Sequence, residues 1–153
     1  MDTKYLYSGK LRPSNAVCVI IFFKKKFLLQ KRDNKKDIFF PDHLGLFGGA
    51  VNKFESNINA IQREVKEELN LLVHKRRFKY FSNIELDLKK IGHKKYIRTI
   101  YTLEIRKEEI PRIKLFEGKY LLWTKFFDTI TKLILVPYDA FALWLFLFST
   151  KNK

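Results

Sequence analysis

The chain has 153 residues, a formal net charge of +15 and a pI near 9.9; this length fits one domain, which we expect to span residues 1–153. Apolar residues make up 46% and aromatic residues 16%, which is enough for one sizeable core and excludes a disordered chain. The longest strongly apolar stretch, Ala140–Phe148, is nine residues, far short of the roughly 20 that a membrane-crossing helix needs. We therefore expect a folded domain without a membrane span.

Strands are expected on both sides of one helical segment. The first is a continuous β-branched and aromatic run, typical of a strand buried on both faces. A Lys-rich turn follows it and predicts a hairpin, and the polar residues 33–42 predict a loop. The expected strands are Ala16–Phe23, Phe27–Lys31, Leu44–Phe47, Arg77–Leu88, Tyr96–Ile105 and Tyr120–Phe127.

Two segments have helical periodicity. Ser56 is a good N-cap for a helix from Asn57 to about Leu69. Pro137 stands at the first turn of a second helix that runs to about Phe148 and is apolar nearly all round, so it is either well buried or part of an oligomer interface. The apolar face predicted for the first helix consists of Ile58, Ile61, Val65, Leu69 and Leu72. Together these elements predict a mixed α/β layered domain.

The cysteine content bears on the compartment. Cys18 is the single cysteine, so the chain cannot form an internal disulfide. The N-terminal MDTKYLYSGK lacks the continuous apolar stretch of a signal peptide. Both features favour the cytoplasm. Cys18 itself lies in an apolar run without an evident partner for nucleophilic chemistry, which indicates a core position.

The basic excess is typical of nucleic-acid-binding proteins, but its distribution favours a simpler interpretation. The lysines occur in short runs, such as Lys24–Lys26 and Lys89–Lys90, most of which fall where turns are expected. Residues 49–71 are an exception, because four glutamates there outnumber three basic residues. We interpret most of the basic runs as solvated loops and keep RNA binding as an alternative.

Three glutamates, Glu64, Glu67 and Glu68, occupy a sector beside the apolar face of the first helix. Their Cβ atoms should lie about 5–6 Å apart, so we expect like-charge repulsion to raise the pKa values of their carboxyl groups. Mg²⁺ would remove this repulsion, because oxygen ligands at this spacing can share a hard cation that also gathers substrate phosphates. The alternative is an ordinary solvated helix face, partly compensated by Arg63 and Lys66.

The spacing around these glutamates favours the metal site. Gly49, Glu55 and the run Arg63–Leu71 (REVKEELNL) resemble the Nudix hydrolase signature, G-x5-E-x7-R-E-U-x-E-E-x-G-U with U aliphatic, at eight of its nine specified positions. Asn70 stands where the family has Gly. That position ends the helix and should need a left-handed conformation, which Asn tolerates best among residues with a side chain. The preceding LFGG segment and Glu117-Gly118 followed by Trp123 also resemble family segments.

The resemblance implies a Nudix α/β/α sandwich with a mixed central sheet, and a pyrophosphatase that needs Mg²⁺, with Mn²⁺ as the alternative metal. Arg63 would orient the carboxylates, and Glu64 is the first candidate for the general base, ahead of Glu117. Glu55 and Asn70 would be structural. The implied metal ligands are Glu64, Glu67, Glu68 and a backbone carbonyl of Gly48 or Gly49.

The same resemblance implies hydrolysis of a nucleoside diphosphate linked to another moiety, with a nucleoside triphosphate or a nucleotide sugar as the leading substrate. The alternatives are removal of pyrophosphate from RNA 5′ ends and a non-catalytic nucleotide- or RNA-binding module on the same scaffold. A homodimer fits the family. The three histidines, which share no metal-ligand spacing and are expected to be solvated or capping, are His43, His74 and His93.

Overall fold

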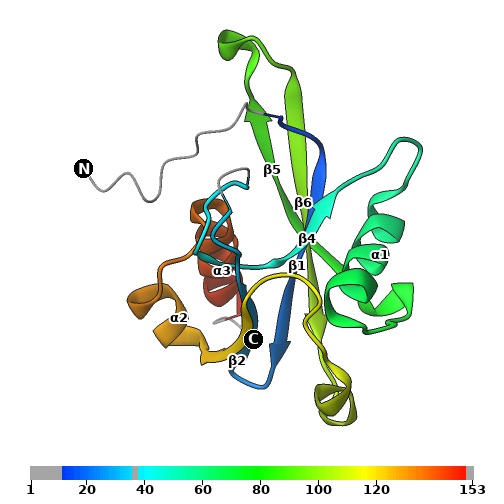
Figure 1. The fold of residues 1–153 in the computed structure, drawn as a ribbon, viewed down its shortest axis with the longest axis vertical. Helices are drawn as coiled ribbons and strands as arrows, with labels where there is room; N and C mark the ends of the chain where they lie inside the picture. Colours follow the sequence, from blue (N-terminus) through cyan, green and yellow to red (C-terminus); the bar gives the residue numbers. More distant parts are fainter. Residues whose placement is uncertain (1–11, 36–37, 151–153) are drawn as a thin grey trace.

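A seven-stranded mixed sheet forms the centre of the molecule (Figure 1). The computed structural model describes residues 12–35 and 38–150, so the N-terminal MDTKYLYSGK lies outside the described residues. The strands are β1 (Ala16–Phe23), β2 (Lys26–Lys31), β3 (Leu44–Gly45), β4 (Phe47–Ala50), β5 (Lys79–Asp87), β6 (Lys95–Glu104) and β7 (Tyr120–Lys125). The helices are α1 (Asn57–Leu69), α2 (Phe126–Lys132) and α3 (Pro137–Thr150), with 3-10 turns at Lys75–Arg77, Lys89–Ile91 and Lys107–Arg112.

Strand β1 organises the sheet. One edge of β1 pairs with β6 in parallel, and β6 pairs with β5 in an antiparallel hairpin. The other edge is shared, because β4 pairs with the first half of β1 while β2 pairs with the second half. Strand β2 pairs in turn with β7. This division places the Gly48-Gly49 segment of β4 directly beside the first half of β1.

Helices cover both faces of the sheet, with α1 on one face and α2 and α3 on the other (Figure 1). Side chains alternate along β1, so Val17, Val19 and Ile21 belong to the core under α1. Cys18 and Ile20 belong to the second core, under α3. The prediction of a strand buried on both faces and of an α/β/α sandwich is confirmed, and Cys18 is a fully buried core residue as expected.

The ends of α1 are set by the residues predicted to set them. The Ser56 hydroxyl accepts a hydrogen bond from the Asn59 backbone N–H, and Asn70 adopts φ 53° and ψ 29°, the left-handed conformation. Leu72 was expected on the buried face of the helix, and this was wrong, because its side chain is 74% exposed. The left-handed residue turns the chain away from the helix axis, so helical spacing no longer places side chains beyond Leu69.

Several boundaries differ from the expected ones. The strand expected at Tyr120–Phe127 ends at Lys125, and Phe126 begins the short helix α2, which was missed because its two phenylalanines continue the apolar pattern of the strand. The single strand expected at Leu44–Phe47 is divided into β3 and β4. A 3-10 turn precedes β5, and the His74 side chain caps it by accepting a hydrogen bond from the Arg76 backbone N–H, which fits the expected capping role.

Helix α3 buries one side and exposes the other. Ala142, Leu143 and Phe146 pack against the sheet. The opposite side exposes three rings that contact one another in series, namely Phe141, Trp144 and Phe148. Of the two outcomes expected for this apolar helix, burial therefore holds for one side. Within the described residues, no helix is long and apolar enough to cross a membrane.

Candidate active site

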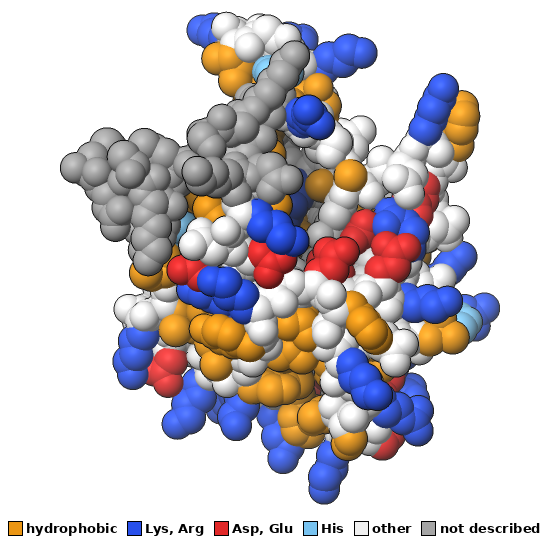
Figure 2. All heavy atoms as spheres, in the orientation of Figure 1, with side chains coloured by type: hydrophobic (Ala, Val, Ile, Leu, Met, Phe, Trp, Pro, Cys, Tyr) orange, Lys and Arg blue, Asp and Glu red, His pale blue; other side chains and the backbone are white. Residues whose placement is uncertain are grey.

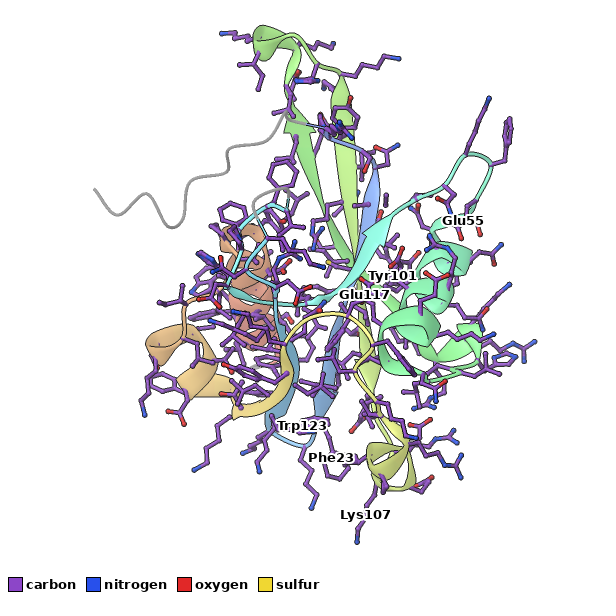
Figure 3. The ribbon with its side chains drawn as sticks, viewed as in Figure 1. Phe23, Glu55, Tyr101, Lys107, Glu117 and Trp123 are labelled. Atoms are coloured by element: carbon purple, nitrogen blue, oxygen red, sulfur yellow. The ribbon has the colours of Figure 1, made fainter. Side chains whose placement is uncertain are left out.

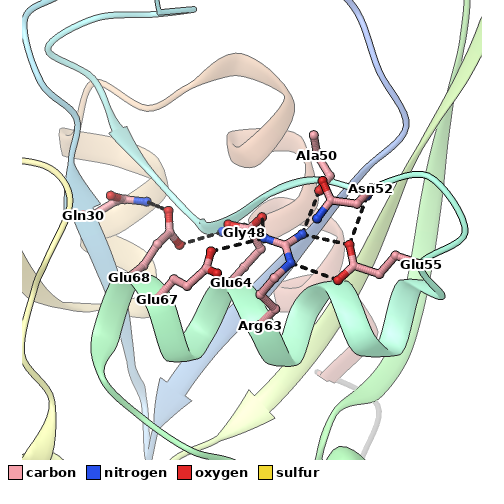
Figure 4. Close-up of polar contacts among 9 residues, drawn as sticks. All are labelled: Gln30, Gly48, Ala50, Asn52, Glu55, Arg63, Glu64, Glu67 and Glu68. Carbon is pink, nitrogen blue, oxygen red and sulfur yellow. Dashed lines mark hydrogen bonds and ion pairs between the residues drawn. The ribbon is translucent and has the colours of Figure 1, made fainter.

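Glu68 is the most deeply placed carboxylate on α1 (Figure 4). Its side chain is 5% exposed. Oε2 accepts a hydrogen bond from the Gly48 backbone N–H at 2.9 Å, and Oε1 accepts one from Gln30 Nε2 at 3.3 Å. Burial raises the pKa of Glu68 to about 8, and the negative charges of Glu64 and Glu117 add to the rise. The expected like-charge repulsion therefore contributes, but desolvation, which was not considered, is the larger effect.

Glu64 lies against β4 at a point where only glycine leaves room. A Cβ atom on Gly49 would be 2.7 Å from Glu64 Oε1 and 2.8 Å from Oε2, which is closer than real Cβ atoms approach. Burial raises the pKa of the Glu64 carboxyl group above its ordinary value, although Arg63 opposes the rise. The second glycine of the pair therefore provides the space in which this carboxylate sits.

Arg63 connects the acidic residues of α1 to the loop before the helix. Its Nε and Nη2 atoms each donate to one oxygen of Glu55 at 2.9 Å. Its Nη1 atom donates to Glu64 Oε1 at 2.6 Å and to Glu67 Oε2 at 3.2 Å, and Nη2 also donates to the Ala50 carbonyl. The hydrogen bonds from Arg63 lower the pKa of Glu55 to about 2. This network holds the loop, the helix and β4 together (Figure 4).

Glu117 comes from the loop before β7 (Figure 3). It lines the same hollow as Glu68 and acts on it through its charge. The preceding residue, Phe116, donates its backbone N–H to the Glu68 carbonyl at 2.9 Å, which ties the loop to the end of α1. Gly118 follows with φ 91° against β2, where a Cβ atom would be 2.7 Å from the Lys31 carbonyl. Because these contacts fix both neighbours, the Glu117 carboxylate stays close enough to Glu68 to raise its pKa.

A hollow of about 340 Å³ opens between these carboxylates and basic residues of the β2 end. Glu68 and Glu117 line one part of it, and Arg32 and Lys35 line another. Figure 2 shows the acidic side chains gathered in the middle of this face of the molecule. The arrangement places negative and positive charge around one solvent-filled space, which suits a ligand with phosphates bridged to a cation.

The acidic residues do not form a ready cation cage. Among residues 12–35 and 38–150, no group of three or more His, Cys, Asp or Glu side chains is arranged to hold a metal ion. Glu67 is directed to Arg63 instead. The residues nevertheless fit a hard divalent cation, because Glu64 and Glu68 are carboxylates one helical turn apart whose pKa values are raised mainly by burial. A cation beside them would stabilise their charged forms.

A second polar group, which the sequence did not suggest, lies on the other face of the sheet. Arg98 Nη2 donates to Asp139 Oδ1 at 2.8 Å, and the guanidinium group stacks on the Tyr138 ring at 4.5 Å. The Arg98 Nε atom is buried without a hydrogen-bond partner among the described residues. Arg98 and Tyr138 line a mostly apolar cavity of about 400 Å³, together with Phe39, Phe40 and Tyr96.

Hydrogen bonds connect this cavity to the carboxylates. Asp139 Oδ2 accepts from the Leu46 backbone N–H at 2.9 Å, and the Leu46 carbonyl accepts from Gln30 Nε2 at 3.2 Å. The same Gln30 amide donates to Glu68. Gln30 could not be found from spacing, because it lies 38 residues from Glu68 and stands beside Lys31 at the polar end of β2.

The α/β/α sandwich with an acidic helix packed on a Gly-Gly strand agrees with a match to one protein family. Residues 12–125 match the family described as NUDIX domain. The chain therefore belongs to the Nudix hydrolase family and is a hydrolase of phosphorus-containing anhydrides. Among curated proteins, none matches the chain.

Solved structures share the fold at low sequence identity. A MutT NUDIX hydrolase from Burkholderia pseudomallei is 21% identical with a TM-score of 0.69, covering 88% of this chain and 98% of that one. A MutT protein from Methanosarcina mazei Go1 is 22% identical with a TM-score of 0.69, covering 94% and 99%. A C. elegans Ap4A hydrolase is 20% identical with a TM-score of 0.62, covering 91% and 100%.

Proposed function

We propose that the chain hydrolyses the diphosphate linkage of a small nucleotide, with a nucleoside triphosphate as the leading substrate and a nucleotide sugar as the next. The observation that carries this proposal is the hollow beside β4. There the buried carboxylate Glu68 and the loop residue Glu117 lie opposite Arg32 and Lys35. Glu64 stands one helical turn before Glu68 on α1. Carboxylates can hold a cation, and the two basic residues can contact the remaining phosphate oxygens.

Glu64, Glu67 and Glu68 would hold Mg²⁺, or Mn²⁺ as the alternative, with the backbone carbonyl of Gly48 or Gly49 as a further ligand. When bound, the cation supplies Lewis-acid polarisation of the phosphoanhydride and lowers the pKa of an attacking water. Glu67 is 57% exposed and pairs with Arg63 in its present position. It would have to exchange this ion pair for the cation.

Glu64 is our first candidate for the general base. Arg63 donates to its Oε1 atom, so Oε2 is the atom that would take the proton of the attacking water. Arg63 acts by positioning this carboxylate. Glu117 is the second candidate, because it lines the hollow beside Glu68 and its loop is fixed to α1 and β2.

The apolar cavity around Arg98 supports a nucleotide over inorganic pyrophosphate. Its aromatic lining and the guanidinium group of Arg98, which stacks on Tyr138, suit a flat heterocyclic ring. The contacts through Leu46 and Gln30 join it to Glu68. A ring held there and phosphates held at the carboxylates together describe a nucleotide.

The experiment is a substrate panel with Mg²⁺ or Mn²⁺, read as release of phosphate and pyrophosphate. The panel contains nucleoside triphosphates, nucleotide sugars, ADP-ribose and Ap4A, which one structural neighbour is named for hydrolysing. We expect turnover of a nucleoside triphosphate that is lost in Glu68→Gln. Absence of turnover of every compound with either metal would contradict the proposal.

RNA 5′-end pyrophosphohydrolysis is the second candidate, favoured by the net charge of +15. A steep fall of kcat/KM with salt on a 5′-triphosphate RNA would support it, whereas a small nucleotide should give a shallow dependence.

The proposal also includes a homodimer and a cytoplasmic location. The exposed rings of α3 would form the dimer interface, and the single cysteine suits the cytoplasm. Size-exclusion chromatography with light scattering tests the dimer.

A further inference from the structure

An apolar hollow of about 790 Å³ lies at the turn between β1 and β2, beside the junction of β7 and α2. Its walls are aromatic and its rim is basic. The residues that line it are Phe23, Lys24, Lys25, Lys26, Lys125, Phe126 and Phe127. None of them takes part in the carboxylate network described above.

The two phenylalanines that begin α2 have different surroundings. Phe126 stacks on Phe27 at 4.2 Å between ring centroids, which anchors the start of the helix to the core. Phe127 is 72% exposed. A large exposed aromatic side chain beside an apolar hollow indicates a binding surface, because a partner that covers it removes apolar area from water.

The rim carries four lysines and no acidic residue. The nearest acid in sequence, Asp128, is paired with Lys132 at 2.8 Å. Lys24 lies in the two-residue hairpin turn with φ 54°, a conformation for which Gly or Asn is the usual choice. Lys24 therefore stands at a position where Gly or Asn would cost less backbone strain.

We propose that this hollow docks the protein on an anionic lipid bilayer. Phe127 and Phe23 would enter the boundary between headgroups and acyl chains, and the four lysines would contact the lipid phosphates. A nucleic acid is the weaker fit, because the lining has no Arg, Asn, Gln, Ser or Thr side chain to pair with base edges. The charge of the rim complements the bilayer, and its apolar floor complements the acyl chains.

The position of the hollow leaves the carboxylates accessible to water. Gly48 and Gly49 pair with Cys18 and Val17 in the first half of β1, whereas the hollow begins at Phe23, at its other end. In Figure 2, basic side chains gather along the lower edge of the molecule, below the acidic side chains. Membrane docking at this end is therefore compatible with catalysis, and it is independent of the substrate proposed above.

Sedimentation with vesicles tests the proposal. We expect the full chain to bind phosphatidylcholine vesicles that contain phosphatidylserine and not vesicles of phosphatidylcholine alone. Lys25→Ala should weaken binding about fivefold, which is about 1 kcal/mol per lysine near an anionic surface. Phe127→Ser should weaken binding at least about tenfold, because burying a Phe side chain contributes more binding free energy than one lysine near the anionic surface.

Matched controls separate this surface from general charge. Lys90→Ala removes one lysine from the far β5–β6 turn, and Phe54→Ser removes a ring that is 95% exposed elsewhere. Both should bind vesicles like the wild type, and circular dichroism verifies that each variant is folded. Equal binding by Phe127→Ser and wild type would overturn the proposal. So would single-stranded RNA that binds as tightly as the vesicles and loses the same affinity in Lys25→Ala and Phe127→Ser.

Discussion

Gly49→Ala should separate folding from catalysis. The added Cβ atom would lie 2.7 Å from Glu64 Oε1, whereas ordinary contact begins at 3.4 Å, so the Glu64 carboxylate must move by about 0.7 Å. The clash is with the end of a flexible side chain, and the Gly49 backbone does not require a positive φ. Stability should change by less than about 1 kcal/mol, since the lower entropy of the unfolded alanine chain offsets the moved contacts.

Activity should fall much more. A displacement approaching 1 Å at a catalytic group can cost about a hundredfold, so we expect kcat/KM on the best panel substrate to drop between about tenfold and a hundredfold. The melting temperature should shift by no more than about 2–4 °C. Measuring kcat/KM and the melting temperature of the purified variant tests both expectations. A kcat/KM within twofold of the wild type would refute the assignment of Glu64 to the catalytic centre.

Two other glycines serve as controls for Gly49→Ala. Gly48 has φ 136°, and a Cβ atom there would meet the Val17 carbonyl at 2.1 Å, so Gly48→Ala should destabilise the fold by about 3 kcal/mol or more. Gly92 has φ 84° with open space around it, so Gly92→Ala should cost about 1 kcal/mol and leave kcat/KM unchanged. A common loss of stability in all three variants would contradict the distinction.

Four further outcomes are expected. Glu68→Gln should lower kcat by about a hundredfold or more in the best panel assay, while the melting temperature holds because burial already disfavours charge there. Asn70→Gly should leave kcat within about twofold and stability within about 1 kcal/mol, since Asn70 already adopts the left-handed conformation; a tenfold gain in kcat would show a distorted helix end. Cys18 should resist iodoacetamide at pH 8 until the protein is denatured, because burial raises the pKa of its thiol to about 12; rapid labelling of native protein would contradict this. Millimolar Mg²⁺ should raise the wild-type melting temperature, measured by differential scanning fluorimetry, and raise that of Glu68→Gln less.

The sequence was sufficient to predict the parts of the site that are local in the chain. Arg63, Glu64, Glu67 and Glu68 follow one another on α1, so helical geometry alone relates them. The N-cap and the left-handed end at Asn70 were also predictable, because each depends on one residue and its immediate neighbours.

The contacts between distant segments were not predictable. Gln30 reads as an ordinary strand residue, and only the pairing of β1 with β2 and β4 brings it to Glu68. Asp139 resembles a first-turn helix acid, and nothing local indicates that it pairs with Arg98. Desolvation raises the pKa of Glu68 more than charge repulsion does, and this depends on how β4 packs over the side chain. The periodicity of the helix does not describe that packing.

The hydrogen bonds from Asp139 through Leu46 and Gln30 to Glu68 hold the Arg98 cavity at a set distance from the carboxylates. They fix the span between the Arg98 cavity and the carboxylates through backbone and buried side chains, which do not adjust to the ligand. The bond that is cut would then be chosen by its distance from the ring. On the proposed function, a nucleotide longer by one phosphate at the far end of its chain would present the same linkage to the carboxylates. The nucleotide product would then stay the same, and the released group would be longer by one phosphate.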